Sequence, residues 1–309
     1  MPPDPLAREI TYAGSARTAA GRAVVRLLEA AGGRGGLLRR ARGYRAEVDA
    51  GGDFWGVICA RYGVGLRIVR GTLDAIPARG PVVVVANHPF GILDGLILGR
   101  ILSDRRGGDF RILAHSVFDR APELARALLP VDFAETPEAR RANLAMRAGA
   151  LAYLADGGAI GVFPGGTVST AATPFGPALD PVWRSFTAKL VARADVTVVP
   201  LFFEGANPRL FQLASHLHCT LRLGLLIPAF RARIDAPVRV AVGDPVPRAA
   251  IAGFGRDARG LMAHLRAATY ALSDRPAPPW LGLELEPRYR DERRARLRAD
   301  LPAEAARGL

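Results

Sequence analysis

The stretch VVVVANHPFGILDGL, residues 82–96, decides the fold and contains the first candidate site. Its four consecutive valines form a short apolar run that leads to His88. A run without alternating polar residues is typical of a strand that is buried on both faces, as in a parallel sheet covered by helices. Pro89 and Gly91 interrupt the run and predict a turn. A second apolar segment, which contains Asp94, predicts a helix after this turn.

Short apolar strands and helical segments alternate along most of the remaining chain. Strands are expected near residues 66–70, 81–86, 109–114, 159–163, 196–203 and 236–242. Helices are expected near residues 53–63, 92–102, 121–129, 137–155, 181–193, 208–222 and 256–273. This alternation predicts an α/β fold, a mainly parallel mixed sheet flanked by helices.

The composition favours one large domain with appendages, because half of the 309 residues are hydrophobic. We expect a basic helical N-terminal segment over residues 1–65, a main domain over residues 66–275 and a charged C-terminal tail over residues 276–309. The basic amphipathic helices of the first segment fit either a membrane surface or ordinary packing on the domain. No window offers the ~18 apolar residues that a membrane span needs, so any membrane contact is expected to be peripheral.

The formal net charge of +13 favours acidic partners, such as anionic lipid surfaces or an acidic carrier protein. Lys189 is the single lysine among 42 basic residues. This imbalance is typical of a GC-rich coding sequence, so arginine alone does not indicate phosphate recognition. Nucleic acid is disfavoured as a partner, because the arginines are scattered among acidic residues and only 7% of residues are aromatic. The two cysteines, Cys59 and Cys219, lack metal-ligand spacing, and no metal site is expected.

His88 and Asp94 are the first candidate catalytic residues. His88 follows the carboxyl end of a predicted strand, which is where ligands bind in open α/β sheets. On one continuous helix the two side chains would point about 120° apart, so only a turn between them lets them meet. In that case a carboxylate fixes the tautomer of an imidazole that accepts a proton. In the alternative interpretation both are structural: His88 bonds a backbone carbonyl, and Asp94 is an acid in the first turn of a helix.

Two further strand ends carry polar or glycine-rich segments. In GVFPGGTVSTA, residues 161–171, the glycine backbone can present N–H groups to an oxyanion or a phosphate, although an ordinary glycine-rich turn fits as well. In VTVVPLFFEGANPRLF, residues 196–211, Glu204 and Asn207 follow the strand. Because the carboxyl ends of parallel strands share one edge of a sheet, a binding site is expected there.

NHPFGILDG, GVFPGGTVS and VVPLFFEGANPRLF together resemble the motifs of the glycerolipid acyltransferase superfamily, which includes the 1-acylglycerol-3-phosphate acyltransferases. The resemblance extends from about residue 67 to about residue 247 and is greatest for the hemolysin-like lysophospholipid acyltransferase branch. As in that branch, five residues separate His88 from Asp94, where the superfamily usually has four. The usual Phe-Pro-Glu-Gly-Thr-Arg-Ser motif also differs, because Gly165 replaces the Glu and Val168 replaces the Arg.

The resemblance implies a glycerol-3-phosphate acyltransferase-like fold and an acyltransferase without cofactor, metal or covalent intermediate. His88 would be the general base and Asp94 would orient it. The acceptor hydroxyl would attack the thioester of an acyl carrier protein or of coenzyme A. Loss of the motif arginine removes an expected phosphate contact, for which other arginines are candidates. The candidate substrate-binding residues are Asn87, Phe163, Pro164, Gly165, Gly166, Thr167, Glu204, Asn207, Arg140, Arg141 and Arg209.

Several alternatives remain for the substrate and the role. The acceptor is expected to be a lysophospholipid or a similar lyso-lipid, and a lyso-ornithine or other amino-acid lipid is an alternative because the motif arginine is missing. A non-catalytic lipid-binding or acyl-carrier-binding protein is an alternative of another class. The expected setting is phospholipid or lipid metabolism in a bacterium. The expected location is cytoplasmic and peripheral, on the inner face of the cell membrane.

Overall fold

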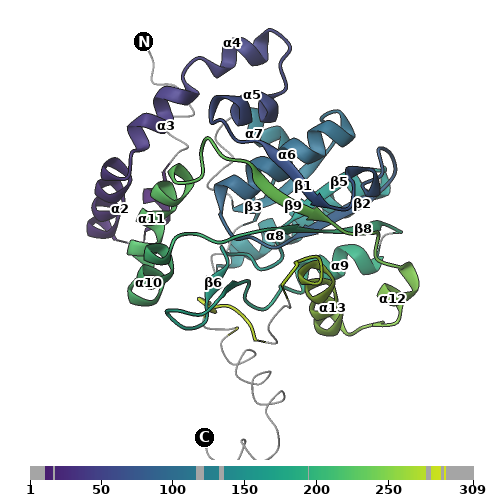
Figure 1. Ribbon diagram of the computed structural model, residues 1–309. Coiled ribbons are helices and arrows are strands. Elements are labelled where there is room, and N and C mark those ends of the chain that lie inside the picture. Colours follow the sequence, from purple (N-terminus) through teal and green to yellow (C-terminus); the bar gives the residue numbers. More distant parts are fainter. Residues whose placement is uncertain are drawn as a thin grey trace, which may run out of the picture.

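A computed structural model describes residues 11–16, 18–115, 122–131, 136–193, 195–275, 280–286 and 289. Figure 1 shows a central sheet with helices on both faces, which confirms the expected α/β class. None of the helices within these ranges combines the length and the apolar character that crossing a membrane requires. Residues 1–10, 276–279 and 290–309 of the expected terminal segments lie outside the described residues.

The main sheet has seven strands in the order β1-β9-β8-β2-β5-β3-β4. The strands of the protein are β1 Leu66–Arg70, β2 Val82–Ala86, β3 Arg111–His115, β4 Leu128–Val131, β5 Ala159–Val162, β6 Thr170–Ala171, β7 Ala178–Leu179, β8 Thr197–Phe203 and β9 Val238–Val242. Neighbouring strands of the main sheet are parallel, except that β8 and β9 are antiparallel. The short strands β6 and β7 form a separate antiparallel hairpin.

Helices cover both faces of the sheet. The α-helices are α2 Ala19–Ala31, α3 Arg34–Ala41, α4 Tyr44–Asp49, α5 Phe54–Arg61, α6 Ile92–Arg106, α7 Pro122–Ala127, α8 Pro137–Ala155, α9 Phe186–Arg193, α10 Arg209–Leu217, α11 Cys219–Arg231, α12 Arg248–Ala252 and α13 Ala258–Tyr270. Two short 3-10 helices are η1 Ala13–Ser15 and η2 Leu73–Ala75. One apolar core includes residues of α5, α6 and α11, and the other includes residues of α8, α9 and α13.

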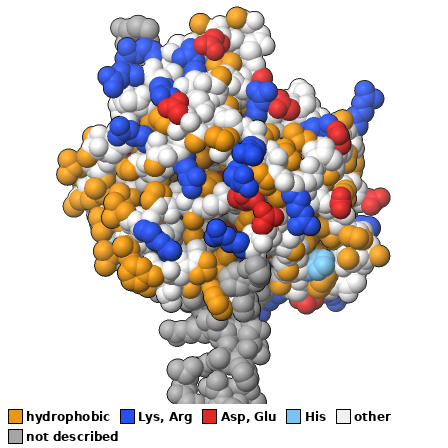
Figure 2. All heavy atoms as spheres, viewed as in Figure 1, with side chains coloured by type: hydrophobic (Ala, Val, Ile, Leu, Met, Phe, Trp, Pro, Cys, Tyr) orange, Lys and Arg blue, Asp and Glu red, His pale blue; other side chains and the backbone are white. Residues whose placement is uncertain are grey.

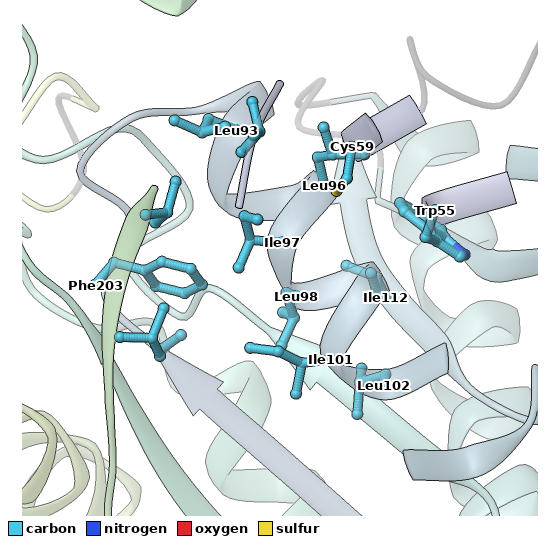
Figure 3. Packing of buried hydrophobic residues seen from close by; sticks show 14 of the residues in the cluster. Trp55, Cys59, Leu93, Leu96, Ile97, Leu98, Ile101, Leu102, Ile112 and Phe203 are labelled. Carbon is cyan, nitrogen blue, oxygen red and sulfur yellow. The ribbon is translucent and has the colours of Figure 1, made fainter. Parts of the chain in front are cut away.

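Strand β2 lies at the centre of the sheet and contributes to both cores. Val82 and Val84 belong to the core shared with α5 and α6, whereas Val83 and Val85 belong to the core on the opposite face. All four valines are 0% exposed. Burying such a side chain stabilises the fold by about 1.5–3 kcal/mol. Figure 3 shows the first core, where Ile97 and other apolar side chains of α6 pack between the sheet and α5. Burial on both faces explains why this strand has no polar alternation.

Two predicted helices end differently in the structure. The helix predicted over residues 121–129 is wrong at its C-terminal end, because α7 ends at Ala127 and residues 128–131 form β4. β4 is an edge strand, where Pro130 is tolerated because one side of the strand needs no ladder hydrogen bond. The helix predicted over residues 208–222 is two helices, α10 and α11, which are separated at the extended residue His218.

The segment between β5 and α9 also differs from the prediction. The helix predicted over residues 181–193 begins only at Phe186. The preceding residues instead form the β6–β7 hairpin and a loop, in which Arg184 N donates to Pro164 O at 2.8 Å. The sequence analysis did not predict this hairpin. Its strands have only two residues each, which is too short for a periodic pattern.

Parts of both terminal segments pack against the main domain. Helix α2 packs on α11, with Val25 0% exposed and Glu29 1% exposed. Near the other terminus, Gly282 N donates to Asp180 O and Leu283 N donates to Thr170 O, so residues 280–286 lie along the hairpin. Part of the predicted tail is therefore held by the domain.

Candidate active site

The three strand ends identified in the sequence lie next to one another at the carboxyl edge of the sheet. β2 pairs with β5 on one side and with β8 on the other, and both pairings are parallel. The register places Val85 beside Val162 and Ala86 beside Leu201. The strands β2 and β5 therefore end at nearly the same level, and β8 extends two residues beyond the end of β2, to Phe203.

The structure brings the side chains of His88 and Asp94 together. His88 Nδ1 lies 3.0 Å from Asp94 Oδ2. The His88 side chain is 18% exposed, whereas Asp94 is fully buried. Asp94 Oδ2 also accepts the backbone N–H groups of Phe90 at 2.7 Å and Gly91 at 3.0 Å. The carboxylate thus holds the turn closed and faces the imidazole with the same oxygen.

Gly91 makes this turn possible. Its φ of 85° and ψ of −117° lie where side chains other than hydrogen are strained. A Cβ at this position would also lie 3.3 Å from Val168 Cγ2. Gly91 is the N-cap of α6, which places Asp94 in the first turn of that helix. The helix dipole there favours a negative charge.

Two opposing effects act on the Asp94 carboxyl. Burial raises its pKa, while the contact with His88 and the N–H groups of Phe90 and Gly91 act in the opposite direction. Its second oxygen, Oδ1, is buried and has no hydrogen-bond partner among the described residues. Because Nδ1 of His88 faces this carboxylate, Nε2 is the nitrogen that remains for a substrate proton. The pair therefore has the arrangement of a general base and the group that orients it.

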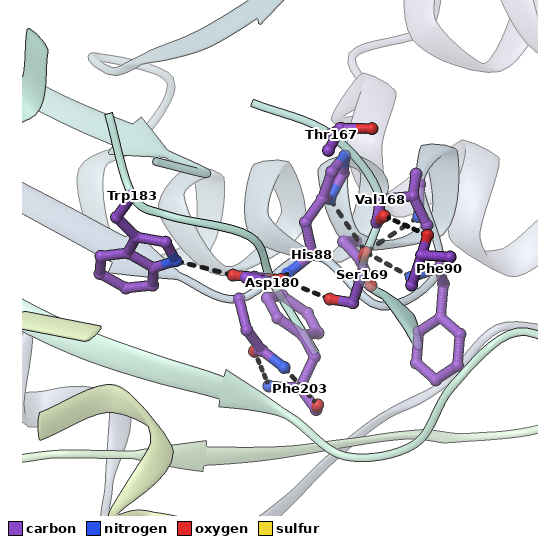
Figure 4. Close-up of polar contacts among 12 residues, drawn as sticks. His88, Phe90, Thr167, Val168, Ser169, Asp180, Trp183 and Phe203 are labelled. Atoms are coloured by element: carbon purple, nitrogen blue, oxygen red, sulfur yellow. Dashed lines mark hydrogen bonds and ion pairs between the residues drawn. The ribbon is translucent and has the colours of Figure 1, made fainter. Parts of the chain in front are cut away.

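The loop after β5 lies against His88. The rings of His88 and Phe163 stack with centroids 4.2 Å apart and an angle of 25° between their planes. Gly166 N donates to Phe163 O at 3.0 Å and closes a turn, so this N–H group is engaged. Ser169 N donates to His88 O at 2.7 Å. Figure 4 shows His88 between the buried Asp180 and the loop residues Thr167, Val168 and Ser169.

A buried arginine that the sequence analysis did not identify supports this loop. Arg222, on α11, is 3% exposed and donates through Nη2 to Thr167 Oγ1 at 3.0 Å and to Val168 O at 2.8 Å. Nη1 donates to Thr170 Oγ1 and Ser215 Oγ. Burial lowers the pKa of Arg222 to about 10. The groups that accept these hydrogen bonds are hydroxyls and a backbone carbonyl and not carboxylates, so the described residues leave the positive charge of Arg222 uncompensated beside Val168.

Three predicted residues after β2 and β8 are buried or paired. The Asn87 side chain accepts from Phe203 N at 2.7 Å and donates to Phe203 O at 3.0 Å, which joins β2 to β8 beyond the sheet pairing. Glu204 Oε2 lies 2.6 Å from Arg239 Nε. Asn207 is 4% exposed, and neither atom of its amide has a hydrogen-bond partner among the described residues. Of the three, Asn207 has polar atoms available for a ligand.

The three predicted arginines occupy different places. Arg140 and Arg141 are exposed at the start of α8, where Arg141 Nη2 lies 3.6 Å from Glu138 Oε1. The structure gives neither residue a contact with the loop after β5 within the described chain. Arg209 is exposed at the start of α10 and donates to Gly176 O at 2.9 Å. The arginine that contacts the altered motif is Arg222, and no local pattern marks it among the other arginines of this chain.

The histidine–aspartate pair lies at the carboxyl edge of an α/β sheet beside a glycine-containing loop, and its geometry is the one that general base catalysis requires. Comparisons with known proteins find similarity to acyltransferases over part of the chain. Residues 67–204 match the family model described as Acyltransferase. A lyso-glycine lipid O-acyltransferase from Phocaeicola vulgatus is 30% identical over 139 residues, which are 45% of this chain and 47% of that protein. The chain therefore matches about half the length of this curated relative.

The solved structure of the 1-acyl-sn-glycerophosphate acyltransferase from Thermotoga maritima aligns with 72% of this chain and 78% of that chain, with a TM-score of 0.46 and 16% sequence identity. The matched family region contains His88, Asp94 and the loop after β5. Residues 67–204 of this chain are therefore similar to the acyltransferase family.

Proposed function

We propose that this protein is an O-acyltransferase that moves a fatty acyl group from an acyl thioester to the hydroxyl group of a lyso-lipid. The observation that carries the proposal is the contact of 3.0 Å between His88 Nδ1 and Asp94 Oδ2 at the carboxyl edge of the sheet. The match of residues 67–204 to the acyltransferase family model supports acyl transfer as the reaction class of this pair.

In the proposed reaction His88 Nε2 accepts the proton of the acceptor hydroxyl. The hydroxyl oxygen then forms a bond to the thioester carbonyl carbon, and the carbonyl oxygen becomes an oxyanion. When this intermediate collapses, the C–S bond breaks and the thiolate takes the proton from His88. Asp94 remains ionised and stabilises the imidazolium between the two proton transfers. The acyl group passes directly between the substrates, so no acyl-enzyme forms.

Thr167 and Arg222 support an acceptor with an anionic head group. Thr167 Oγ1 accepts from Arg222, so its own proton is free to point to a ligand oxygen, and Thr167 is partly exposed. The uncompensated charge of Arg222 makes the potential at this end of the loop positive. A carboxylate or phosphate group fits this potential. The unpartnered amide of Asn207 is a further candidate contact at the same edge.

The acceptor class therefore includes lysophospholipids and lyso-amino-acid lipids, which carry a phosphate and a carboxylate group respectively. The relative from Phocaeicola vulgatus is described as acting on a lyso-glycine lipid, which belongs to the second group. As donor we propose acyl carrier protein or acyl-coenzyme A. Both are anionic and suit a chain with a formal net charge of +13.

We further propose that the protein works at a membrane surface, through an apolar area on α2 and α10. Leu27 on α2 is 70% exposed, and Leu210 and Leu217 on α10 are 65% and 76% exposed. Figure 2 shows hydrophobic side chains gathered on the side of the molecule where Figure 1 places α2 and α10. Arg26 is exposed on the same helix and Arg22 is partly exposed, and both suit anionic lipids.

The proposal is tested with purified protein, a labelled acyl thioester and a panel of lyso-lipids. We expect transfer to at least one anionic lyso-lipid and a loss of at least about a thousandfold in His88→Ala. His264→Ala is the matched control, because His264 lies on α13 beside Phe254 and is expected to leave the rate unchanged. Transfer that survives in His88→Ala would exclude His88 as the base.

Two other outcomes would favour a different function. Binding of acyl thioester or lyso-lipid without transfer to any acceptor would indicate a non-catalytic lipid- or carrier-binding protein. Release of free fatty acid in the absence of an acceptor would indicate a thioesterase. Donor identity follows from the same assay, by comparing acyl carrier protein with coenzyme A thioesters of equal chain length.

A further inference from the structure

A second buried carboxylate, Asp180, lies behind the main chain of His88. Asp180 is 0% exposed and follows strand β7. Its Oδ1 accepts from His88 N at 3.2 Å and from the Ser169 hydroxyl, and its Oδ2 accepts from Trp183 Nε1 at 2.8 Å. Figure 4 shows these contacts converging on the Asp180 side chain. The proposed reaction does not use this carboxylate.

The β6–β7 hairpin explains how Asp180 reaches this place. In the hairpin Thr170 pairs with Leu179, so the preceding Ser169 and the following Asp180 are neighbours across the two strands. Ser169 also donates its own N–H to His88 O at 2.7 Å. The N–H and C=O groups of His88 are thus both bonded to the hairpin. The main chain of the proposed base is held by a segment far along the chain, since Asp180 is 92 residues away from His88.

The bonding pattern at this point requires a group that only accepts hydrogen bonds. The three groups that face the carboxylate are the N–H of His88, the hydroxyl of Ser169 and the indole N–H of Trp183. An amide in place of the carboxylate would direct an N–H against one of these donors.

We propose that Asp180 is a positioning residue that fixes the main chain of His88, and hence the direction of its imidazole, relative to the loop after β5. The proposal rests on the proposed acyltransferase function of the same site. Asp180 touches no reacting atom in this scheme; it acts through His88 N and through Ser169. A shift of the base by about 1 Å can lower a reaction rate by about a hundredfold. Loss of the Asp180 carboxylate is expected to lower the rate by up to this factor.

The test compares Asp180→Asn with Glu284→Gln in the transfer assay. Asp180→Asn keeps the shape of the side chain, and we expect kcat to fall by about ten- to a hundredfold while the KM for both substrates changes less than about threefold. Glu284 is the matched control, because it is also buried, at 3% exposed, but is bonded to Arg184 and not to His88. Glu284→Gln is expected to lower the melting temperature and to leave kcat per folded molecule unchanged.

A double variant tests the direction of the hydrogen bonds. In Asp180→Asn the amide N–H points either to Trp183 or to His88, and the first orientation conflicts with the indole N–H. Trp183→Phe removes that donor, so the amide oxygen can stay with His88 N and the Ser169 hydroxyl. We therefore expect Asp180→Asn/Trp183→Phe to regain at least about threefold in kcat over Asp180→Asn, although the Trp183→Phe substitution alone lowers stability.

The possible results separate this proposal from the proposed function. Full kcat in Asp180→Asn, or a loss of activity that only follows the folded fraction measured by circular dichroism, would refute the positioning role. Equal losses of kcat in Asp180→Asn and Glu284→Gln would refute it as well. If His88→Ala is inactive in the same assay, these results leave the acyltransferase function intact. If His88→Ala keeps its activity, His88 is not the base, and the positioning role of Asp180 fails together with that assignment.

Discussion

Replacing Asp94 by Asn separates the chemical role of this carboxylate from its effect on stability. In the structure one oxygen, Oδ2, contacts His88 Nδ1 and both N–H groups of the turn, while Oδ1 has no partner among the described residues. The amide oxygen of Asn can take the place of Oδ2 and keep all three contacts. The geometry and the tautomer of His88 are therefore retained, and the variant loses the negative charge.

The loss in rate follows from that charge. With the imidazolium and carboxylate charges about 4 Å apart and an effective dielectric constant of about 20, their attraction is about 4 kcal/mol. This attraction exists only while His88 carries the proton, so its loss raises the barrier without changing substrate binding. We expect kcat in Asp94→Asn to fall by about a thousandfold and KM to change little.

The effect on stability has the opposite sign. Because burial raises the pKa of Asp94 in the folded protein, the ionised carboxylate favours the unfolded state, where it is hydrated. A raised folded-state pKa gives a stability contribution that is present at low pH and is lost as the pH rises through the folded pKa. Asp94→Asn should therefore melt at a higher temperature than the wild type at pH 8, and this difference should shrink as the pH falls into the acid range.

The assay measures initial transfer rates and thermal unfolding of the same preparations. Asp104→Asn is the control, because Asp104 lies on the same helix but is partly exposed and pairs with Arg100 at the surface. It should leave both the rate and the pH dependence of unfolding close to the wild type. A folded Asp94→Asn variant that keeps a tenth or more of the wild-type kcat would refute the charge argument. A lower melting temperature at pH 8 would refute the argument on stability.

Three further predictions concern the turn, the buried arginine and the apolar surface. Gly91→Ala should lower the free energy of unfolding, measured by denaturant titration, by about 1–3 kcal/mol. Gly95→Ala is the control and should not destabilise the protein, because a Cβ there meets no atom within 4 Å. Equal effects of the two substitutions would contradict the role of the positive φ. Arg222→Gln should lower kcat/KM for an anionic lyso-lipid by about tenfold or more. Arg209→Gln is the control and should change kcat/KM by less than about threefold. A larger loss of kcat/KM in Arg209→Gln than in Arg222→Gln would exclude Arg222 from acceptor recognition. Leu217→Ser should weaken sedimentation with anionic vesicles several-fold at unchanged melting temperature, since this side chain is 76% exposed; unchanged sedimentation would place the membrane contact elsewhere.

Much of the sheet could be predicted from the sequence, because inner strands such as β2 and β5 are buried on both faces. Strand β2 has four consecutive valines, and the structure divides them between the two cores. Strand β4 was not predicted, since its Pro130 is acceptable only at the edge of a sheet, and the position in the sheet is not encoded locally. The β6–β7 hairpin was missed for a similar reason, because two-residue strands carry no periodic signal.

The local sequence was enough to predict the contact between the two proposed catalytic residues. His88 and Asp94 lie on either side of a short turn. The positive φ of Gly91 allows this turn to bring the two side chains into contact. Local chain geometry decides such a contact, and local geometry can be predicted from residue types.

Only the tertiary structure decided which other charges lie beside this pair. Asp180 reaches the main chain of His88 from 92 residues away, and Arg222 reaches Thr167 across 55 residues. Neither residue differs locally from the many other acids and arginines of the chain. Both side chains are buried on folding, so they form hydrogen bonds with the polar groups that packing places next to them. These neighbours are distant in the sequence, and therefore no local sequence pattern predicts them.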